Sequence, residues 1–364
     1  MLLFLGAGAS KPFGIPAMFD FVRIFDEEFK DNELYNKTKE TFSEKEFDLE
    51  VLMTILEDLS KTKEEFFRVV SPQTTQFLFK IDRKEAEHYV NESVIKENAK
   101  KLLTRMKSII RRECVKAIKE KETRIMEVYD EFFQTLSQIQ PRLLERGWEE
   151  SNIARTDMNL PSNLQVFTTN YDTCLETYLN RKQIEYTRGI VYRYGENFFD
   201  VSSYNEIANK IGIFKLHGSI DLFQKKDQIR QLPILNEDIT YLGNDIGEES
   251  IRWPIEFGGY RHVIESPYLD LFRLLRDKIK DEHWWIIIGS SLRDRTICSI
   301  LNDVLRLKEK RERPTILLIN RNPEPVVQRL RDWEFLSFAD SASNVKVEFG
   351  SKGYPNRLLQ IFPS

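Results

Sequence analysis

Three polar side chains with the chemistry to bind or activate a ligand each follow an apolar run of the sequence. The segment "FTTNYD" carries Asn170 and Asp172, and the segment "KLHGSID" carries His217. An amide and a carboxylate can hydrogen-bond a ribose and an amide ligand. Imidazole titrates near neutral pH and serves as an acid or a base. The alternatives are structural: Asn170 and Asp172 would also cap a helix that begins near Thr173, and a lone histidine can simply be part of a folded core.

The opening segment "LFLGAGASKPFGIP" brings an apolar run to two glycines one residue apart. Gly6 and Gly8 remove side chains where a strand turns into a loop, so we expect a ligand, usually a phosphate, to touch main-chain N–H groups there. A plain tight turn into a helix is the alternative. The dinucleotide fingerprint G-x-G-x-x-G would need a third glycine where Lys11 stands, which argues against a standard nicotinamide dehydrogenase.

Two later segments repeat the pattern of an apolar run with a polar end. In "IIIGSSLRDRTI", Gly289, Ser290 and Ser291 are expected to meet a phosphate or a ribose, and Asp294 is a candidate N-cap for the next helix. In "LLINRNP", Asn320 ends a strand, and its structural alternative is a turn before the following helix.

Short apolar runs that alternate with helix-like segments must position these residues. This alternation predicts buried parallel strands with crossover helices, and ligands bind at the carboxyl ends of such strands. The runs after the opening one are "NLQVFTTN", "IGIFKLHG", "WWIIIGSS", "TILLINRN" and "NVKVEFG". The sequence therefore predicts an α/β protein with a Rossmann-like, mostly parallel sheet.

A long stretch without helix breakers interrupts this pattern. No glycine occurs from Ile15 to Arg146, and no proline between Pro72 and Pro141. Such a stretch, rich in Glu, Lys, Leu and Phe, is typical of helices. Apolar residues recur at helical spacing at Leu102, Leu103, Met106, Ile109, Ile110, Cys114, Ala117 and Ile118 and continue from Ile125 to Ile139. We expect a core formed by residues 1–30 and 151–364, with an all-helical insertion domain at 31–150 after the first βα unit.

Composition narrows the function classes. The 364 residues suit two domains, and a net charge of −4 gives no global nucleic-acid signature. Basic residues crowd the segment from Lys100 to Lys116, which we interpret as a solvated helix face, so direct nucleic-acid binding is not expected. The longest apolar runs are too short to span a bilayer, and we expect no membrane association.

Cysteine usage bears on compartment and metal. Cys114, Cys174 and Cys298 form no C-x-x-C pair, and the four histidines are scattered. We therefore expect no structural zinc and no other metal. An odd, sparse cysteine count fits a reducing cytoplasm.

Taken in order, these motifs resemble the sirtuin family. The family pattern runs from a GAG-x-S opening and G-I-P through T-Q-N-x-D, H-G and G-[ST]-S-L to a strand that ends in I-N. The matching residues here are Gly6-Ala7-Gly8-Ala9-Ser10, Gly14-Ile15-Pro16, Thr168-Thr169-Asn170-Tyr171-Asp172, His217-Gly218, Gly289-Ser290-Ser291-Leu292 and Ile319-Asn320. The resemblance covers the α/β part, about two-thirds of the chain, and excludes the helical block.

Departures from the deacylase pattern are equally specific. Ala17-Met18-Phe19 stands where sirtuin deacylases have D-F-R, and Thr169 replaces the glutamine of T-Q-N. The four zinc cysteines that normally follow H-G are missing from Ser219 onward, and Phe257-Gly258-Gly259 only faintly echoes the acyl-peptide-binding F-G-E stretch. These losses argue against protein deacylation while the NAD-binding part is kept.

This combination is similar to the sirtuin-like NAD hydrolases of prokaryotic anti-phage systems. The resemblance implies an NAD+ glycohydrolase that cleaves the nicotinamide–ribose bond, with NAD+ as substrate, to give nicotinamide and ADP-ribose. It also implies an effector that depletes cellular NAD, a homo-oligomer and a separate HerA-type ATPase partner. Two alternatives stay open: a sirtuin-type NAD-dependent protein deacylase, and a non-catalytic module that binds NAD or ADP-ribose.

The resemblance also assigns roles to the candidate residues. Asn170 would hold the ribose and the attacking water, His217 would act as the base, and Asp172 would hold the nicotinamide carboxamide. Asn320 would meet the adenosine ribose. The residues expected around the pyrophosphate and elsewhere along the cofactor are Gly6, Ala7, Gly8, Ser10, Gly289, Ser290 and Ser291.

Overall fold

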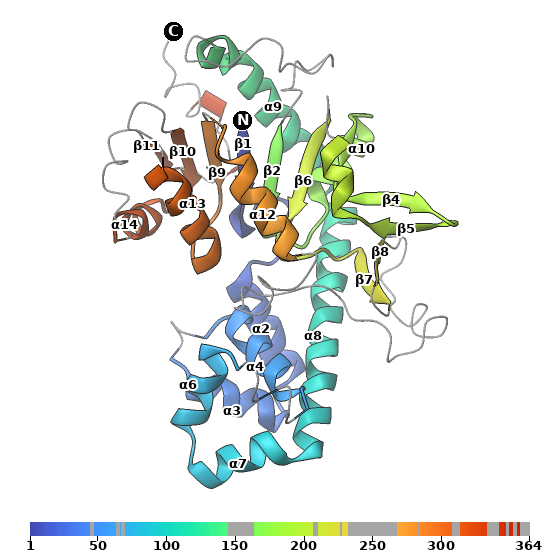
Figure 1. The fold of residues 1–364 in the computed structure, drawn as a ribbon, viewed down its shortest axis with the longest axis vertical. Coiled ribbons are helices and arrows are strands. Elements are labelled where there is room, and N and C mark those ends of the chain that lie inside the picture. The colour runs from blue at the N-terminus through green and yellow to red at the C-terminus, as the bar shows by residue number, and fades with distance from the viewer. Residues whose placement is uncertain are drawn as a thin grey trace.

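A computed structural model gives the fold of the chain (Figure 1). It describes residues 1–43, 47–62, 66, 70–144, 164–206, 210–225, 228–231, 268–282, 284–307, 314–332, 342–346, 349–351 and 355–356.

A seven-stranded parallel sheet forms the centre of the described part of the chain. Its order is β11-β10-β9-β1-β2-β6-β3, and every neighbouring pair is parallel. The strands are β1 (Leu2–Leu5), β2 (Gln165–Thr168), β3 (Tyr186–Thr187), β6 (Ile211–Lys215), β9 (Trp284–Ile288), β10 (Thr315–Asn320) and β11 (Ala342–Lys346). From β1 the chain builds β2 and β6 on one side, and it later returns to place β9 on the other. The strand order therefore reverses at β1, and the crevice at such a point is where open α/β sheets bind ligands.

Both faces of this sheet are buried, because successive strand residues enter two different cores. Leu3 and Leu5 of β1 enter one core, and Leu2 and Phe4 enter the other. The second core is completed by α12 (Tyr268–Lys278), α13 (Arg295–Leu307) and α14 (Glu324–Asp332). The first is completed by α10 (Cys174–Arg181) and by helices from the first 144 residues of the chain. This double burial explains why the strands appear in the sequence as continuous apolar runs.

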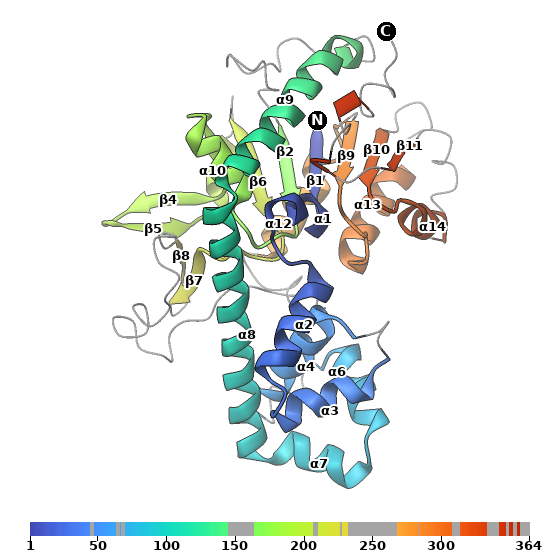
Figure 2. The same cartoon turned by 180° about the vertical axis from the view of Figure 1, so that it is seen from behind.

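A helical lobe lies beyond the carboxyl edge of the sheet (Figures 1 and 2). We use this name for five helices together with the N-terminal half of a sixth, α8. Their bounds are α2 (Met18–Glu28), α3 (Glu33–Thr41), α4 (Leu49–Leu59), α6 (Pro72–Lys80), α7 (Arg83–Asn91) and α8 (Ser93–Glu120). Side-chain caps fix several helix starts: the Asn32, Asp48 and Ser71 side chains accept from Tyr35 N, Val51 N and Thr74 N.

Two long helices connect this lobe to the sheet. In Figure 2, α8 runs from the lobe to the sheet, and α9 (Glu122–Leu144) continues across the sheet's face. The buried stripe of α8 includes Leu102, Met106, Ile109 and Ile110, as the helical spacing predicts. On α9, Tyr129 lies between Phe13 of the short helix η1 (Lys11–Phe13) and Tyr178 of α10, with ring centroids 5.4 Å from each. These contacts anchor α9 to the first strand–loop unit.

The predicted fold class is confirmed: a mostly parallel α/β sheet, with helices between the first βα unit, β1 and α1 (Ala7–Ser10), and β2. The domain boundaries at 30 and 150 stay a prediction, and residue 151 lies outside the described residues. We did not predict a second, antiparallel sheet of order β4-β5-β8-β7. Its strands are β4 (Ile190–Arg193), β5 (Glu196–Phe199), β7 (Leu222–Lys225) and β8 (Gln228–Gln231). None of the helices within the described ranges has the length and apolarity needed to cross a bilayer.

Candidate functional site

A cavity of about 240 Å³ opens at the carboxyl edge of β1, β2, β6 and β9, where the strand order reverses. Nine of the residues singled out in the sequence line it. They are Gly6, Ala7, Ser10, Asn170, Asp172, His217, Gly289, Ser290 and Ser291. Segments separated by more than two hundred residues meet here because parallel strands end at the same edge.

Asn170 lines this cavity and is held by three hydrogen bonds. Its amide Nδ2 donates to Gly6 O at 2.9 Å and to Ser10 Oγ at 2.8 Å, and its backbone N donates to Thr168 Oγ1. Both amide hydrogens therefore tie the loop after β2 to the loop after β1. Within the described residues no donor reaches its Oδ1, so the atom that Asn170 offers to a ligand is an acceptor.

His217 follows β6 and is held by Asp294 from the loop after β9. The distance from His217 Nε2 to Asp294 Oδ2 is 2.9 Å; His217 is buried and Asp294 is partly buried. Asp294 Oδ1 accepts from Thr296 N and Ile297 N, so the predicted N-cap of α13 is confirmed. Burial opposes ionisation of Asp294, but the hydrogen bond and charge of His217 outweigh it, and its pKa lies below the ordinary value. An ionised Asp294 thus orients the imidazole, as a carboxylate does in a catalytic triad.

The helical lobe contributes a second carboxyl group, which we did not predict from the sequence. Glu50, in the first turn of α4, places Oε1 3.9 Å from His217 Nδ1, and both residues line the cavity. Burial raises the pKa of Glu50 to about 7, against the opposing attraction of His217. An acid in the first turn of a helix looks like an ordinary partner of the helix dipole, so the sequence carries no signal for this role.

The glycine loops have a structural role that the sequence analysis did not predict, and their contact with a ligand stays a prediction. The N–H groups of Gly6 and Gly8 donate to Ile288 O and Gly289 O, both at 2.9 Å, so the chain itself uses them. A Cβ on Gly6 would lie 2.4 Å from Ser290 Cα, and one on Gly289 would lie 2.3 Å from Ala9 N. Gly289 also has a φ of +61°. The missing side chains allow two loop backbones to touch, which closes one wall of the cavity.

Asp172 lies at the cavity wall and also begins a helix. Its Oδ1 accepts from the N–H of Cys174, the first residue of α10, at 3.0 Å, while Thr173 occupies the N-cap position and its side chain makes no capping bond. Its backbone oxygen accepts from Lys215 Nζ, and Lys215 also reaches Glu176 Oε1 at 3.3 Å. The site loop after β2 is therefore attached to β6 through a buried lysine.

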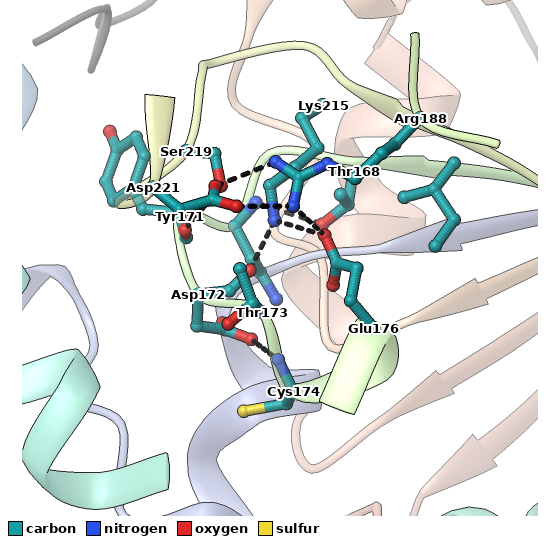
Figure 3. A network of polar contacts seen from close by, with 12 residues as sticks. Thr168, Tyr171, Asp172, Thr173, Cys174, Glu176, Arg188, Lys215, Ser219 and Asp221 are labelled. Atoms are coloured by element: carbon teal, nitrogen blue, oxygen red, sulfur yellow. Dashed lines mark hydrogen bonds and ion pairs between the residues drawn. The ribbon is translucent and has the colours of Figure 1, made fainter. Parts of the chain in front are cut away.

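A buried ionic network behind the cavity holds the loops after β2 and β6 (Figure 3). Arg188 donates from both terminal nitrogens to the two carboxylate oxygens of Asp221, each at 2.8 Å, and lies 3.4 Å from Glu176. Ser219 Oγ donates to Asp221 at 2.6 Å. Burial opposes the charge on Asp221, yet the Arg188 guanidinium and these hydrogen bonds lower its pKa to about 2.

Two predicted site residues are not among those that line the cavity. Gly8 packs against Gly289, as described above. Asn320 donates from Nδ2 to Ser290 O at 3.0 Å and accepts from Asn322 N, which is the turn considered as its alternative. Asn320 therefore supports the Ser290 loop from behind, and its predicted contact with an adenosine ribose stays a prediction.

Arg293 and Phe19 form one rim of the cavity. The Arg293 guanidinium lies 5.7 Å from the Phe19 ring centroid and 3.8 Å from Asp48 of the lobe, and both Arg293 and Phe19 are exposed. Arg293 was visible in the sequence inside "GSSLRDR" but was not singled out there. A cation at the mouth suits an anionic ligand such as a phosphate.

The part of the chain that the structure describes offers few side-chain ligands for a metal. It contains no cluster of three or more His, Cys, Asp or Glu side chains arranged to hold one. Cys114 lines the cavity, but burial raises the pKa of its thiol well above the ordinary value. The absence of zinc stays a prediction, and elemental analysis tests it.

Together these features define an open α/β protein with a ligand cavity at its strand-order reversal, lined by an asparagine and a carboxylate-held histidine. Residues 164–338, a little under half of the chain, match the family described as the SIR2-like domain. This match includes Asn170, His217 and Asp294. No curated protein matches the sequence.

Solved Sir2 structures are also similar to this chain. One is a Sir2 complex with the inhibitor EX-527, 2'-O-acetyl-ADP-ribose and deacetylated p53 peptide, at 13% identity and a TM-score of 0.38, covering 99% of this chain and 93% of the other. Another, a Sir2–p53 peptide–NAD+ complex, has 12% identity, a TM-score of 0.39 and coverages of 99% and 92%. At these values the similarity is distant.

Proposed function

We propose that this protein hydrolyses NAD+ at the nicotinamide–ribose bond, giving nicotinamide and ADP-ribose. The observation that carries the proposal is the meeting of Asn170 and the His217–Asp294 pair in one cavity at the carboxyl edge of the sheet. The SIR2-like match over residues 164–338 supports NAD+ as the ligand. The exposed Arg293 guanidinium at the rim suits its pyrophosphate.

The reaction does not require a general acid from the protein. Nicotinamide leaves as a neutral molecule, so it needs no proton, and the transition state resembles an oxocarbenium ion. The protein must orient the ribose, limit bulk water and direct one water at the anomeric carbon. Asn170 Oδ1 accepts a hydrogen bond from that water or from a ribose hydroxyl, while His217, oriented by Asp294, receives a proton.

Analysis of the products distinguishes hydrolysis from the two alternatives, a deacylase and a binding module. A deacylase would transfer the acyl group of an acyl-lysine peptide to ADP-ribose, and a binding module would leave NAD+ intact. Ala17-Met18-Phe19 and the missing cysteines after Ser219 favour hydrolysis, because they replace residues of the deacylase pattern. The test is chromatography of NAD+ incubated with the purified full chain, with and without an acetyl-lysine peptide. Equimolar nicotinamide and ADP-ribose, unaffected by the peptide, is the expected result. Acyl-ADP-ribose would establish the deacylase, and nucleotide binding without turnover the binding module.

The cellular role is proposed from the sequence resemblance alone. We propose an anti-phage effector in the cytoplasm that depletes NAD+ as a homo-oligomer, regulated by a HerA-type ATPase. Light scattering at micromolar concentration, with and without co-encoded neighbours, should show an assembly. A monomer under both conditions would contradict this part of the proposal and leave the chemistry unaffected.

A further inference from the structure

The helical lobe places a carboxyl group directly in the cavity, and the reaction proposed above leaves it without a task. Glu50 lies at the second residue of α4, which Asp48 caps through Val51 N at 3.0 Å. The helix start is therefore fixed, and Glu50 is directed to the cavity by the way α4 packs against α8 and α2. Its side chain keeps about a third of its surface exposed (32%), so a small molecule in the cavity can reach it.

The distance between Glu50 and His217 is informative. At 3.9 Å, Oε1 and Nδ1 are too far apart for a direct hydrogen bond. A water molecule at about 2.8 Å from each atom fits between them, because hydrogen bonds of that length span such a gap. A water held there would face the Glu50 carboxylate, which can accept a proton, while Asp294 fixes the far side of the imidazole ring.

We propose that Glu50 is a further catalytic residue, a carboxylate from the helical lobe that accepts the proton of the attacking water in NAD+ hydrolysis. This inference rests on the proposed function. The water oxygen bonds to the anomeric carbon, and the carbon–nitrogen bond breaks with its electron pair going to the nicotinamide ring. The single proton that the water releases passes to Glu50, in place of the His217 acceptor named above, and then to solvent, so the products are ADP-ribose, nicotinamide and H⁺.

The charges around Glu50 suit a base that works near neutral pH. Burial raises its pKa to about 7, so the ionised form that accepts a proton prevails above that pH. The titratable and charged groups that face it from its own and neighbouring elements are His217, Asp48, Asp294, Arg293 and Tyr171. His217 and Arg293 favour the ionised form, and Asp48 and Asp294 oppose it.

The proposed role of Glu50 predicts how the rate of hydrolysis changes with pH. A base must be deprotonated, so kcat/KM of the native protein should rise with pH through about 7 and level off above it. Glu50→Gln keeps the size of the side chain and removes the base. We expect an activity loss of about 10²-fold or more at pH 8, and loss of the part of the pH profile that Glu50 causes. Glu50→Asp should restore part of the rate and the rising limb.

Two controls separate this role from a structural one. Glu33→Gln removes an exposed acid from the first turn of α3, outside the cavity, and should leave the rate and pH profile unchanged. The dissociation constant of ADP-ribose, measured by calorimetry, should change by less than about threefold in Glu50→Gln, because the step lost is proton transfer.

Each outcome decides the matter. Lost hydrolysis with retained ADP-ribose binding supports Glu50 as the base. The inference is overturned, while the proposed function stands, if Glu50→Gln hydrolyses NAD+ within about threefold of the native rate. It is also overturned if this variant loses ADP-ribose binding and melts at a lower temperature than the native protein. A native protein that releases no nicotinamide overturns the proposed function, and the inference falls with it.

Discussion

His217 lies between two carboxyl groups whose pKa values are shifted in opposite directions. The pKa of Asp294 is lowered by the histidine despite burial, whereas burial raises that of Glu50 to about 7. Neighbouring carboxyls whose pKa values are pushed apart are a common mark of an acid–base site. Asp294 is therefore expected to act as a positioning residue, which stays charged while the groups it orients exchange protons.

Substitution of Asp294 separates its two contacts. In Asp294→Asn the remaining oxygen still accepts from Thr296 N and Ile297 N, so the cap of α13 persists. The new amide donates where Oδ2 accepted, so the imidazole loses its orienting partner. We expect kcat to fall by about 10²–10⁴-fold with a changed pH profile.

Asp294→Ala provides the comparison because it also removes the cap. It should lower the melting temperature more than Asp294→Asn does. An Asn variant with native kcat and a native pH profile would show that Asp294 only caps the helix.

At the residue scale, the sequence identified the cavity residues at the strand ends but not every partner. Asn170 and His217 were recognisable because each follows an apolar run that becomes a parallel strand. Glu50 was not recognisable, because its role depends on how α4 packs in three dimensions.

At the scale of elements, burial on both faces made the central strands predictable. Four of the apolar runs that follow the opening one form β2, β6, β9 and β10. The fifth run, "NVKVEFG", overlaps β11, which starts two residues before that run. The antiparallel sheet was missed because its strands are short, and Tyr192 and Arg193 of β4 are exposed. Such strands lack the hydrophobic pattern that identifies a core element.

The touching glycine loops predict a sharp difference between two glycine substitutions. Gly289→Ala places a Cβ 2.3 Å from Ala9 N at a φ of +61°, so the loops after β1 and β9 must separate. Gly195→Ala has a similar φ of +83° but nothing within 4 Å. In urea denaturation, Gly195→Ala should cost about 1–2 kcal/mol of unfolding free energy, which is the strain alone, and Gly289→Ala clearly more. Equal losses would mean that the loop contact is not as close as described.

The buried network predicts a second matched pair. Arg188→Met leaves the carboxylates of Asp221 and Glu176 buried without their main counter-charge, which typically costs about 3–5 kcal/mol. Arg193→Met removes an exposed partner of Asp200 and should cost less than about 1 kcal/mol. Free energies of unfolding from denaturant titration provide the test. A loss for Arg188→Met no larger than that for Arg193→Met would contradict a structural role for the network.

At the scale of the whole molecule, the cavity is bounded by two bodies. The sheet supplies Asn170, Asp172 and His217, while the lobe supplies Asp48 and Glu50. Arg293 bridges them at the rim through Asp48 and Phe19. Sequence analysis predicted both the helical insertion and the sheet but not their joint site, because nothing in local periodicity encodes how a lobe docks.

The measurement that tests the central claim most directly is the initial rate of nicotinamide release from NAD+ by the native chain, Asn170→Ala and His217→Ala, assayed together by chromatography. Asn91→Ala, on the exposed face of α7, is the surface control. We predict nicotinamide and ADP-ribose in equal amounts from the native chain and from Asn91→Ala, and rates lower by about 10²–10⁴-fold in the two cavity variants at unchanged melting temperature. NAD+ left intact by the native chain, or native rates in both cavity variants, would contradict the account.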